Sequence, residues 1–378
     1  MKPLEGVRIL DLSRILAGPL CTMWMADLGA EVIKVERPGV GDETRRWGPP
    51  FVAGESAYFL AVNRGKYGIT LDLTDPAHQR ILQRLIEKSD VIVHNFLPQT
   101  AEKLGVSYEA VRAINPRAVY LAILGFPPGP YREEPGFDAL IQALGGLMAI
   151  TGEDERPAKV GVAIVDVLTA WAGLCGVLGA LLLREKVGRG MAVEATLIEN
   201  SAAALVNVAQ AFFLTREEPQ RLGTAHPQIV PYQAFPAADG LLMVAVGTDP
   251  QFRALCGALG RPELADDPRF ATNPARVQNR ELLLPLLAEI LRQKPRAHWI
   301  AALKKAGVPA GPVNSLSDLF GDLGLVGRIL LEVEHPAVGR YQTLACPLSL
   351  AWPGNPLPPP RLGEHTVEVL RRLGIPIS

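Results

Sequence analysis

One carboxylate stands alone in the most apolar stretch of the sequence. Asp166 is the only charged residue between Lys159 and Arg184, and residues 161–183 around it read GVAIVDVLTAWAGLCGVLGALLL. A carboxylate at a helix start is commonly a cap or a first-turn acid. Apolar surroundings raise a carboxyl pKa, whereas the helix N–H groups favour the charged form by about 0.3–1 kcal/mol. Such a position can keep a poorly hydrated carboxylate charged, which is the state that a nucleophile needs.

The same segment is long enough to cross a bilayer. A charge inside a membrane is costly, and the sequence holds no second segment of this kind. We therefore interpret the segment as a helix buried in a soluble core, and we expect no membrane partner. Gly173, Gly176 and Gly179 recur every third residue and would permit close helix packing.

Composition argues against several classes of function. The 378 residues carry 38 Lys and Arg against 39 Asp and Glu, a net charge of −1. Nucleic-acid binders show a basic excess or stripe, so no nucleic-acid partner is expected, although basic residues gather locally near the N-terminus. The four cysteines form no CxxC pair, and no His/Cys cluster has metal-ligand spacing. Reduced thiols and a start without a long apolar run predict a cytoplasmic protein with no metal site.

Strand and helix signals alternate through the first half of the chain. Short β-like runs are expected at 7–13, 31–38, 68–73, 90–96 and 118–126, with helices at 19–28 and 76–88. Longer helices follow at 135–149, 165–186 and 196–214. The alternation predicts an α/β fold with a mostly parallel, doubly wound sheet, whose ligands bind beyond the carboxyl ends of the strands.

A polar, proline-containing stretch divides the chain. We predict a large domain beginning at residues 1–215, a linker at 216–231 and a small α+β domain at 232–320. The small domain should contain a hairpin with Asp239-Gly240 as its turn. Residues 321–378 are predicted to return to the large domain.

Five stretches, in this order, resemble the class III CoA-transferases, the family that contains formyl-CoA and carnitine CoA-transferases and the α-methylacyl-CoA racemases. The stretches are LAGPLCTMWMADLGAEVIKVERPGVGDETRRWGPP, NRGKYGITLDL, DVIVHNFLPQTAEKLG, PGFDALIQALGGLMAITG and GVAIVDVLTAWAGLCGVLGALLLREKVGRGMAVEATLIEN. A weaker match, GTAHPQIVPYQAFPAADGLLMVAVG, extends the resemblance into the small domain.

The resemblance implies a Rossmann-like large domain and two subunits interlocked as rings in a homodimer. It implies an acyl-CoA:carboxylate CoA-transferase that takes an acyl-CoA and a free carboxylic acid, with coenzyme A as substrate and no tightly bound cofactor. Asp166 would attack the thioester, form an acyl-aspartyl anhydride and then carry CoA as an aspartyl thioester.

The resemblance also implies a CoA site. Arg37 should meet the nucleotide end, Leu71 and Thr74 should line the adenine site, and Asn95 and Lys103 should contact the CoA chain and a phosphate. The backbone around Gly18 is a candidate for stabilising the oxyanions of the reaction.

Two alternatives remain open at this stage. Racemases of the family carry a His before the Asp that corresponds to Asp138, and here that position is Phe137, which exchanges no proton and favours the transferase. Asp138 resembles an active-site carboxylate of both groups, or caps a helix. Leu16 replaces a Gln of the oxalate-using enzymes, so we expect a larger or less polar acyl group than formyl or oxalyl. The other alternative, a silent acyl-CoA-binding protein, has no need for Asp166.

Overall fold

The computed structural model describes residues 1–352, 354 and 356–376, and it contains two compact units. The first unit comprises residues 1–148, 159–210 and 327–378, and the second comprises 149–158 and 211–326. Both ends of the chain therefore belong to the first unit, and the short segment 149–158 packs with the second. The domain boundaries drawn from the sequence stay a prediction.

A six-stranded sheet forms the centre of the first unit, and every neighbouring pair of its strands is parallel. The order β10-β7-β6-β1-β2-β5 reverses between β1 and β6, which is the arrangement of doubly wound sheets. The predicted α/β class is confirmed. The strands are β1 (Arg8–Asp11), β2 (Glu31–Glu36), β5 (Lys66–Thr70), β6 (Val91–His94), β7 (Val119–Leu124) and β10 (Ala192–Thr196).

Helices cover both faces of this sheet. Successive residues of a strand point to opposite sides, so each strand contributes apolar side chains to a core on either face. Ile9 and Val91 belong to the core on one face, and Leu10 and Ile92 belong to the core on the other. The first face is covered by α1 (Ala17–Asp27) and α8 (Ile164–Val187), and the second by α3 (Pro76–Glu87), α5 (Tyr108–Ile114) and α17 (Thr366–Arg372).

The apolar segment around Asp166 forms α8, which is long and apolar enough to cross a membrane by length and composition. In the structure α8 instead packs on α1 and the sheet, where Trp171 lies 4.2 Å from Trp24 between ring centroids. A Cβ at Gly173 would lie 3.1 Å from Leu121, and one at Gly176 would lie 2.6 Å from Val193. These two glycines thus permit the close packing that the sequence predicts.

Two of the predicted long helices are broken in the structure. The helix expected at 135–149 splits at Gly145 and Gly146, because Gly146 adopts a left-handed φ of +84°. The helix expected at 196–214 splits with a bend of 74°, and no glycine or proline marks that break. The resulting pieces are α6 (Asp138–Leu144), α7 (Leu147–Ile150), α9 (Leu197–Ala203) and α10 (Val206–Thr215).

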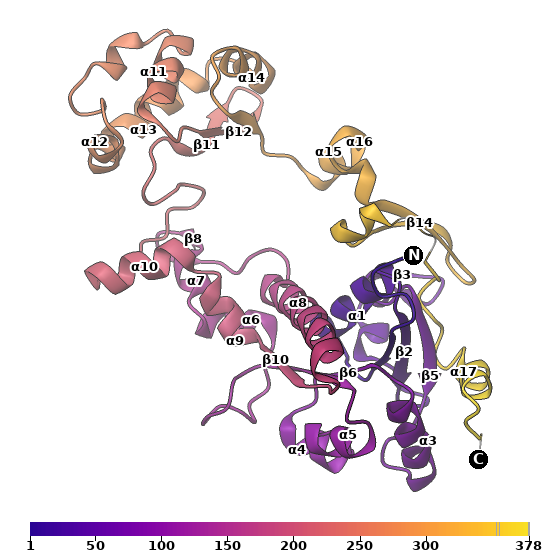
Figure 1. Cartoon of the computed structure of the whole chain (residues 1–378). Coiled ribbons are helices and arrows are strands. Elements are labelled where there is room, and N and C mark those ends of the chain that lie inside the picture. Colours follow the sequence, from indigo (N-terminus) through magenta and orange to yellow (C-terminus); the bar gives the residue numbers. More distant parts are fainter. Residues whose placement is uncertain (353, 355, 377–378) are drawn as a thin grey trace. The chain divides into compact units, whose positions relative to one another are not determined.

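The C-terminal segment joins the first unit through buried polar contacts. The Arg64 guanidinium donates to Asp27 at 2.5 Å and to the Leu344 carbonyl at 2.8 Å, and the Cys346 N–H donates to Asp27 at 2.8 Å. Farther along, the His365 N–H donates to the Gly68 carbonyl of β5, beside which α17 lies (Figure 1). Arg64, one of the basic residues that lie close together in the sequence near the N-terminus, is therefore buried.

The second unit contains the sheet β11-β12-β13 and its own core. Its hairpin pairs Ala237 with Gly240, so the turn is Ala238-Asp239, one residue before the predicted Asp239-Gly240. The elements are β11 (Tyr232–Ala237), β12 (Gly240–Ala245), β13 (Ala310–Pro312), α11 (Asp249–Ala258), α12 (Asn273–Gln278), α13 (Arg280–Leu291), α14 (Arg296–Lys305), α15 (Leu316–Gly321) and α16 (Leu323–Val326).

The described chain also contains further short strands and α-helices. They are β3 (Phe51–Val52), β4 (Glu55–Ser56), α2 (Ala57–Val62), α4 (Pro98–Lys103), β8 (Gly152–Glu153), β9 (Arg156–Pro157), β14 (Leu330–His335) and β15 (Gly339–Leu344).

Candidate active site

Two pockets lie at the carboxyl ends of the parallel strands, where the strand order reverses. The loops that follow β1 and β6 meet there, and Asn95 of the second loop hydrogen-bonds to the backbone of Arg14 in the first. Open α/β sheets bind their ligands at this position. The pockets adjoin, since Arg14, Phe96 and Thr100 line both of them.

The first pocket gathers three of the predicted CoA contacts. Arg37, Leu71 and Thr74 all line it, together with Val35 and Leu104. Thr74 donates its hydroxyl to the Asp72 carboxylate at 2.7 Å, and Arg37 is exposed. The pocket thus offers an apolar slot beside a cation, which suits a nucleotide with a phosphate.

Two of the predicted binding residues lie outside the lining of both pockets. Lys103 is exposed in the last turn of α4. Gly18 is buried in the first turn of α1, where a Cβ would lie 2.3 Å from Ser13. No side chain caps α1, and Leu16 and Ala17, which start this helix, line the second pocket. The structure therefore puts the start of α1, rather than Gly18 itself, at the pocket wall.

The second pocket brings together the two predicted catalytic carboxylates, Asp166 and Asp138. Asp166 lies in the first turn of α8 and Asp138 is the first residue of α6. One Asp138 oxygen accepts the N–H of Val165 at 2.8 Å and that of Asp166 at 3.3 Å, while the other accepts Gln142 at 2.6 Å. Asp138 therefore caps the N-terminus of α8 from another helix.

The Asp166 carboxyl has an unusual environment. Burial, and next the charge of Asp138, raise its pKa to about 7. The helix-dipole effect expected from the sequence does not keep this pKa low, because the N–H groups at the start of α8 point to Asp138. A carboxyl of this kind is poorly solvated and titrates near neutrality, as reactive groups in active sites often do.

Tyr58 is a neighbour that the sequence did not reveal. Burial, followed by the charges of Asp166, Asp138 and Asp42, raises the pKa of Tyr58 to about 12. Its ring packs edge-on against Trp47 at 5.2 Å between centroids. Only the folded chain brings Tyr58 into the electrostatic range of these carboxylates, since more than a hundred residues separate it from Asp166.

His94, the last residue of β6, supports the loop that follows this strand. Its Nδ1 accepts the Phe96 N–H at 3.1 Å, so its proton lies on Nε2, which is 2.5 Å from the Tyr120 hydroxyl. Burial lowers the pKa of His94 to about 4, which keeps the ring neutral. This arrangement agrees with the packing role predicted for His94.

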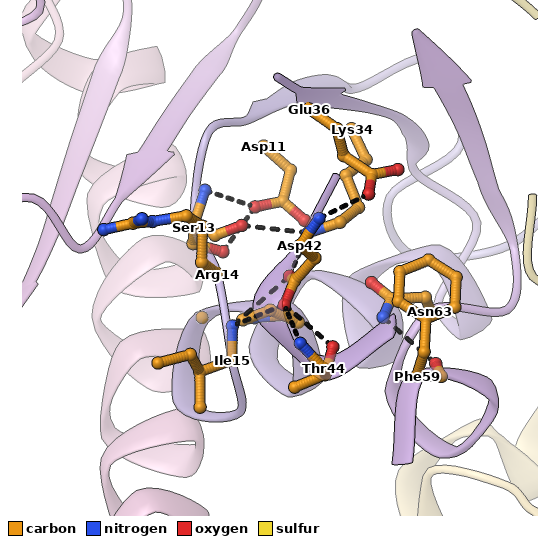
Figure 2. A network of polar contacts seen from close by, with 12 residues as sticks. Asp11, Ser13, Arg14, Ile15, Lys34, Glu36, Asp42, Thr44, Phe59 and Asn63 are labelled. Carbon is orange, nitrogen blue, oxygen red and sulfur yellow. Dashed lines mark hydrogen bonds and ion pairs between the residues drawn. The ribbon is translucent and has the colours of Figure 1, made fainter. Parts of the chain in front are cut away.

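Asp42, which lines the first pocket, belongs with Lys34 and Asp11 to a network of buried charges (Figure 2). Lys66 donates to Asp11 at 3.0 Å, and Lys34 donates to Asp42 at 3.0 Å; all four side chains are fully buried. Burial alone would raise the pKa of Asp11, but the charges of Lys66 and Lys34, together with hydrogen bonds from Ser13 and Thr22, outweigh it and lower this pKa to about 2. Lys66 is one of the basic residues that lie close together in the sequence near the N-terminus, and the structure buries it.

Among the described residues, no group of three His, Cys, Asp or Glu side chains is arranged to hold a metal ion.

A half-buried carboxylate near an apolar slot makes this a candidate enzyme site, and comparisons with known proteins identify the class. The model of CoA-transferase family III matches residues 4–366. The chain is 43% identical to a succinyl-CoA:glutarate CoA-transferase of Mus musculus, over 99% of this chain and 87% of that protein. It is 39% identical to a succinate–glutarate CoA-transferase of Agrobacterium fabrum, over 98% and 96%.

The solved structures agree. A CAIB/BAIF family protein from Brucella suis is similar with a TM-score of 0.86 and 40% identity, over 98% of this chain and 99% of that one. The chain therefore belongs to CoA-transferase family III. It is an enzyme of this class, which removes the silent binding protein from the alternatives.

Asp166→Asn is expected to stabilise the protein increasingly as the pH rises from about 4 to about 7. The unfolded chain releases this proton near the ordinary value of 3.8, whereas the folded chain retains it up to about 7, so the wild type loses stability across this window. Allowing for partial exposure, we expect a gain of about 2–3 kcal/mol at pH 7.5 in urea unfolding. In an Asp138→Asn background the gain should shrink; a gain independent of pH would contradict the raised pKa.

Proposed function

We propose that this enzyme transfers CoA between carboxylic acids through covalent intermediates on Asp166. The Asp166 carboxylate attacks the thioester carbonyl of the donor, and CoA leaves as a thiolate, so that an acyl-aspartyl anhydride forms. The thiolate then attacks the aspartyl carbonyl and releases the donor acid, which leaves an aspartyl-CoA thioester. The acceptor carboxylate repeats these steps in reverse and regenerates Asp166, with no net proton transfer.

The environment of Asp166 is the observation that carries this proposal. A carboxylate with little solvation is a better nucleophile than a hydrated one, and although its pKa is raised to about 7, a large share of Asp166 is still ionised at neutral pH. Each tetrahedral intermediate carries an oxyanion, which the uncapped N-terminus of α1 at the pocket wall would stabilise. In this proposal Asp138 positions the start of α8.

The shared wall of the two pockets supports an orientation for CoA. The nucleotide end would occupy the first pocket, near Arg37, Leu71 and Thr74, and the thioester would reach Asp166 in the second. Asn95 and Lys103 stay predicted contacts of the CoA chain. The racemase alternative is disfavoured because Phe137, which lines the second pocket, offers no second proton carrier.

We also propose that the substrates are dicarboxylic acids longer than oxalate. The relatives named above act on succinate and glutarate. Among the described residues that line the second pocket, Arg14 alone has a cationic side chain. Its guanidinium is 2.6 Å from Glu43 and lies over the Phe96 ring. A distal substrate carboxylate would replace Glu43 as its partner, while Leu16 and Phe137 contact the carbon chain.

Asp166→Ala is expected to fold and to bind CoA, but to lose transfer by at least about a thousandfold, because the nucleophile is absent. Wild-type enzyme incubated with an acyl-CoA and then hydroxylamine should carry a hydroxamate at Asp166, detected by peptide mass spectrometry. The Asp166→Ala peptide is the control. Retained transfer in this variant, or an unmodified wild-type peptide during turnover, would remove the anhydride from the mechanism.

Arg14→Gln is expected to lower the preference for glutarate over pentanoate, two acceptors of equal length, by about 10–100-fold in kcat/KM, the range of a charge-assisted hydrogen bond. The control Glu43→Gln keeps the cation and should keep the preference. A wild-type enzyme that uses both acids equally would refute the dicarboxylate proposal and leave the Asp166 chemistry intact.

The first unit is proposed to act as a Rossmann-like CoA-binding domain within an interlocked homodimer. Large apolar side chains on α6 and α8 are exposed in the single chain, namely Leu140, Leu144, Leu182, Leu183 and Val187. Exposed apolar surface of this kind favours a protein partner. Light scattering should give twice the chain mass of 40.7 kDa, and a monomer at micromolar concentration would exclude the dimer.

A further inference from the structure

The segment Arg14–Leu16 forms the wall between the two pockets, and its centre has an unfavourable backbone conformation. Ile15 has a φ of +73°, in the left-handed region. A β-branched residue is rarely found there, because its side chain crowds its own backbone. Ile15 and Leu16 line the second pocket, and Arg14 lines both pockets. Something must therefore hold this wall in place.

Two side chains from other loops hold the segment. The Asn95 amide accepts the Arg14 N–H at 2.9 Å and donates to the Arg14 carbonyl at 2.7 Å, so it binds both backbone polar groups of this residue. The Asp42 carboxylate accepts the next N–H, that of Ile15, at 3.3 Å to each oxygen (Figure 2).

The Asp42 carboxylate is itself fixed by the buried network. Lys34, which is fully buried, donates to Asp42 at 3.0 Å and to the Ser13 carbonyl at 2.9 Å. Thr44 donates to Asp42 through both its N–H and its hydroxyl. Lys34 thus binds Ser13, the residue before the wall segment, and Asp42, the residue that accepts the Ile15 N–H.

We propose that Asn95 and Asp42 are positioning residues, which hold Ile15 in its left-handed conformation and thereby fix the wall that faces Asp166. Without these hydrogen bonds the Ile15 backbone would relax to a favoured region, and Arg14 and Leu16 would move with it. In this structure the Asn95 amide hydrogen-bonds to the backbone of the neighbouring loop. This inference rests on the proposed function only for its activity measurement.

The test compares Ile15→Ala with Ile15→Gly, each with and without Asn95→Ala. Alanine and glycine both remove the side chain from the pocket, but only glycine adopts a positive φ freely. In the Ile15→Ala background, Asn95→Ala should lower kcat about tenfold, with a smaller change in KM, because residue 15 would leave its strained conformation and displace the wall that faces Asp166. In the Ile15→Gly background the loss should be less than about threefold.

Urea unfolding of the same four proteins supplies a readout that does not depend on catalysis. The Ile15→Gly variant should unfold at a higher urea concentration than the Ile15→Ala variant, which reverses the usual order of these two residue types. Equal losses of kcat in both backgrounds, or a more stable alanine variant, would overturn the proposal. If the proposed transfer reaction fails in the wild type, the order of stability still decides whether Ile15 is held under strain.

Discussion

The structure depends on charges that are buried beneath its ligand crevice. Asp11, Lys34, Asp42 and Lys66 come from three neighbouring strands and the loop after the second of them, and all four side chains are fully buried. A buried charge is tolerable only when it is paired and hydrogen-bonded, and the loss of one partner leaves the other uncompensated. The Asp11–Lys66 pair therefore links β1 to β5, and the Lys34–Asp42 pair links β2 to the loop that follows it.

Desolvation destabilises a buried charge, and in the proposed reaction it also makes the Asp166 carboxylate more nucleophilic. Lys34 and Lys66 lower the pKa of Asp11, whereas Asp166 has no cation among the causes that shift its pKa, which rises to about 7. The helix N–H groups that would favour its charge are taken by Asp138. Asp138 thus orders the start of α8 and at the same time opposes the ionisation of its neighbour. One fold accordingly contains a carboxylate that stays charged for stability and another that titrates in the range of catalysis.

The positions of the pockets follow from the topology of the sheet. The loops after β1, β2, β5, β6 and β7 all begin at the carboxyl ends of the parallel strands, and each contributes residues to one or both pockets. Phe96 lies between the pockets and is held from below by neutral His94, while Arg14 is held by Asn95. The proposed CoA site and the proposed acyl site therefore belong to one hydrogen-bonded framework, in which Phe96 and Arg14 are positioned by His94 and Asn95.

The sequence by itself determined the α/β class, most of the sheet strands, the place of Asp166 at a helix start and the family, because periodicity and motif order are local properties of the chain. The tertiary structure alone decided that Lys34 and Lys66 are buried, that Asp138 caps a helix 27 residues away, and that Asn95 holds Arg14. The bend between α9 and α10 also could not be predicted from the sequence, since no glycine or proline marks it. These features arise from contacts between distant segments, and the charge, pKa and orientation of a side chain follow from its partners in space.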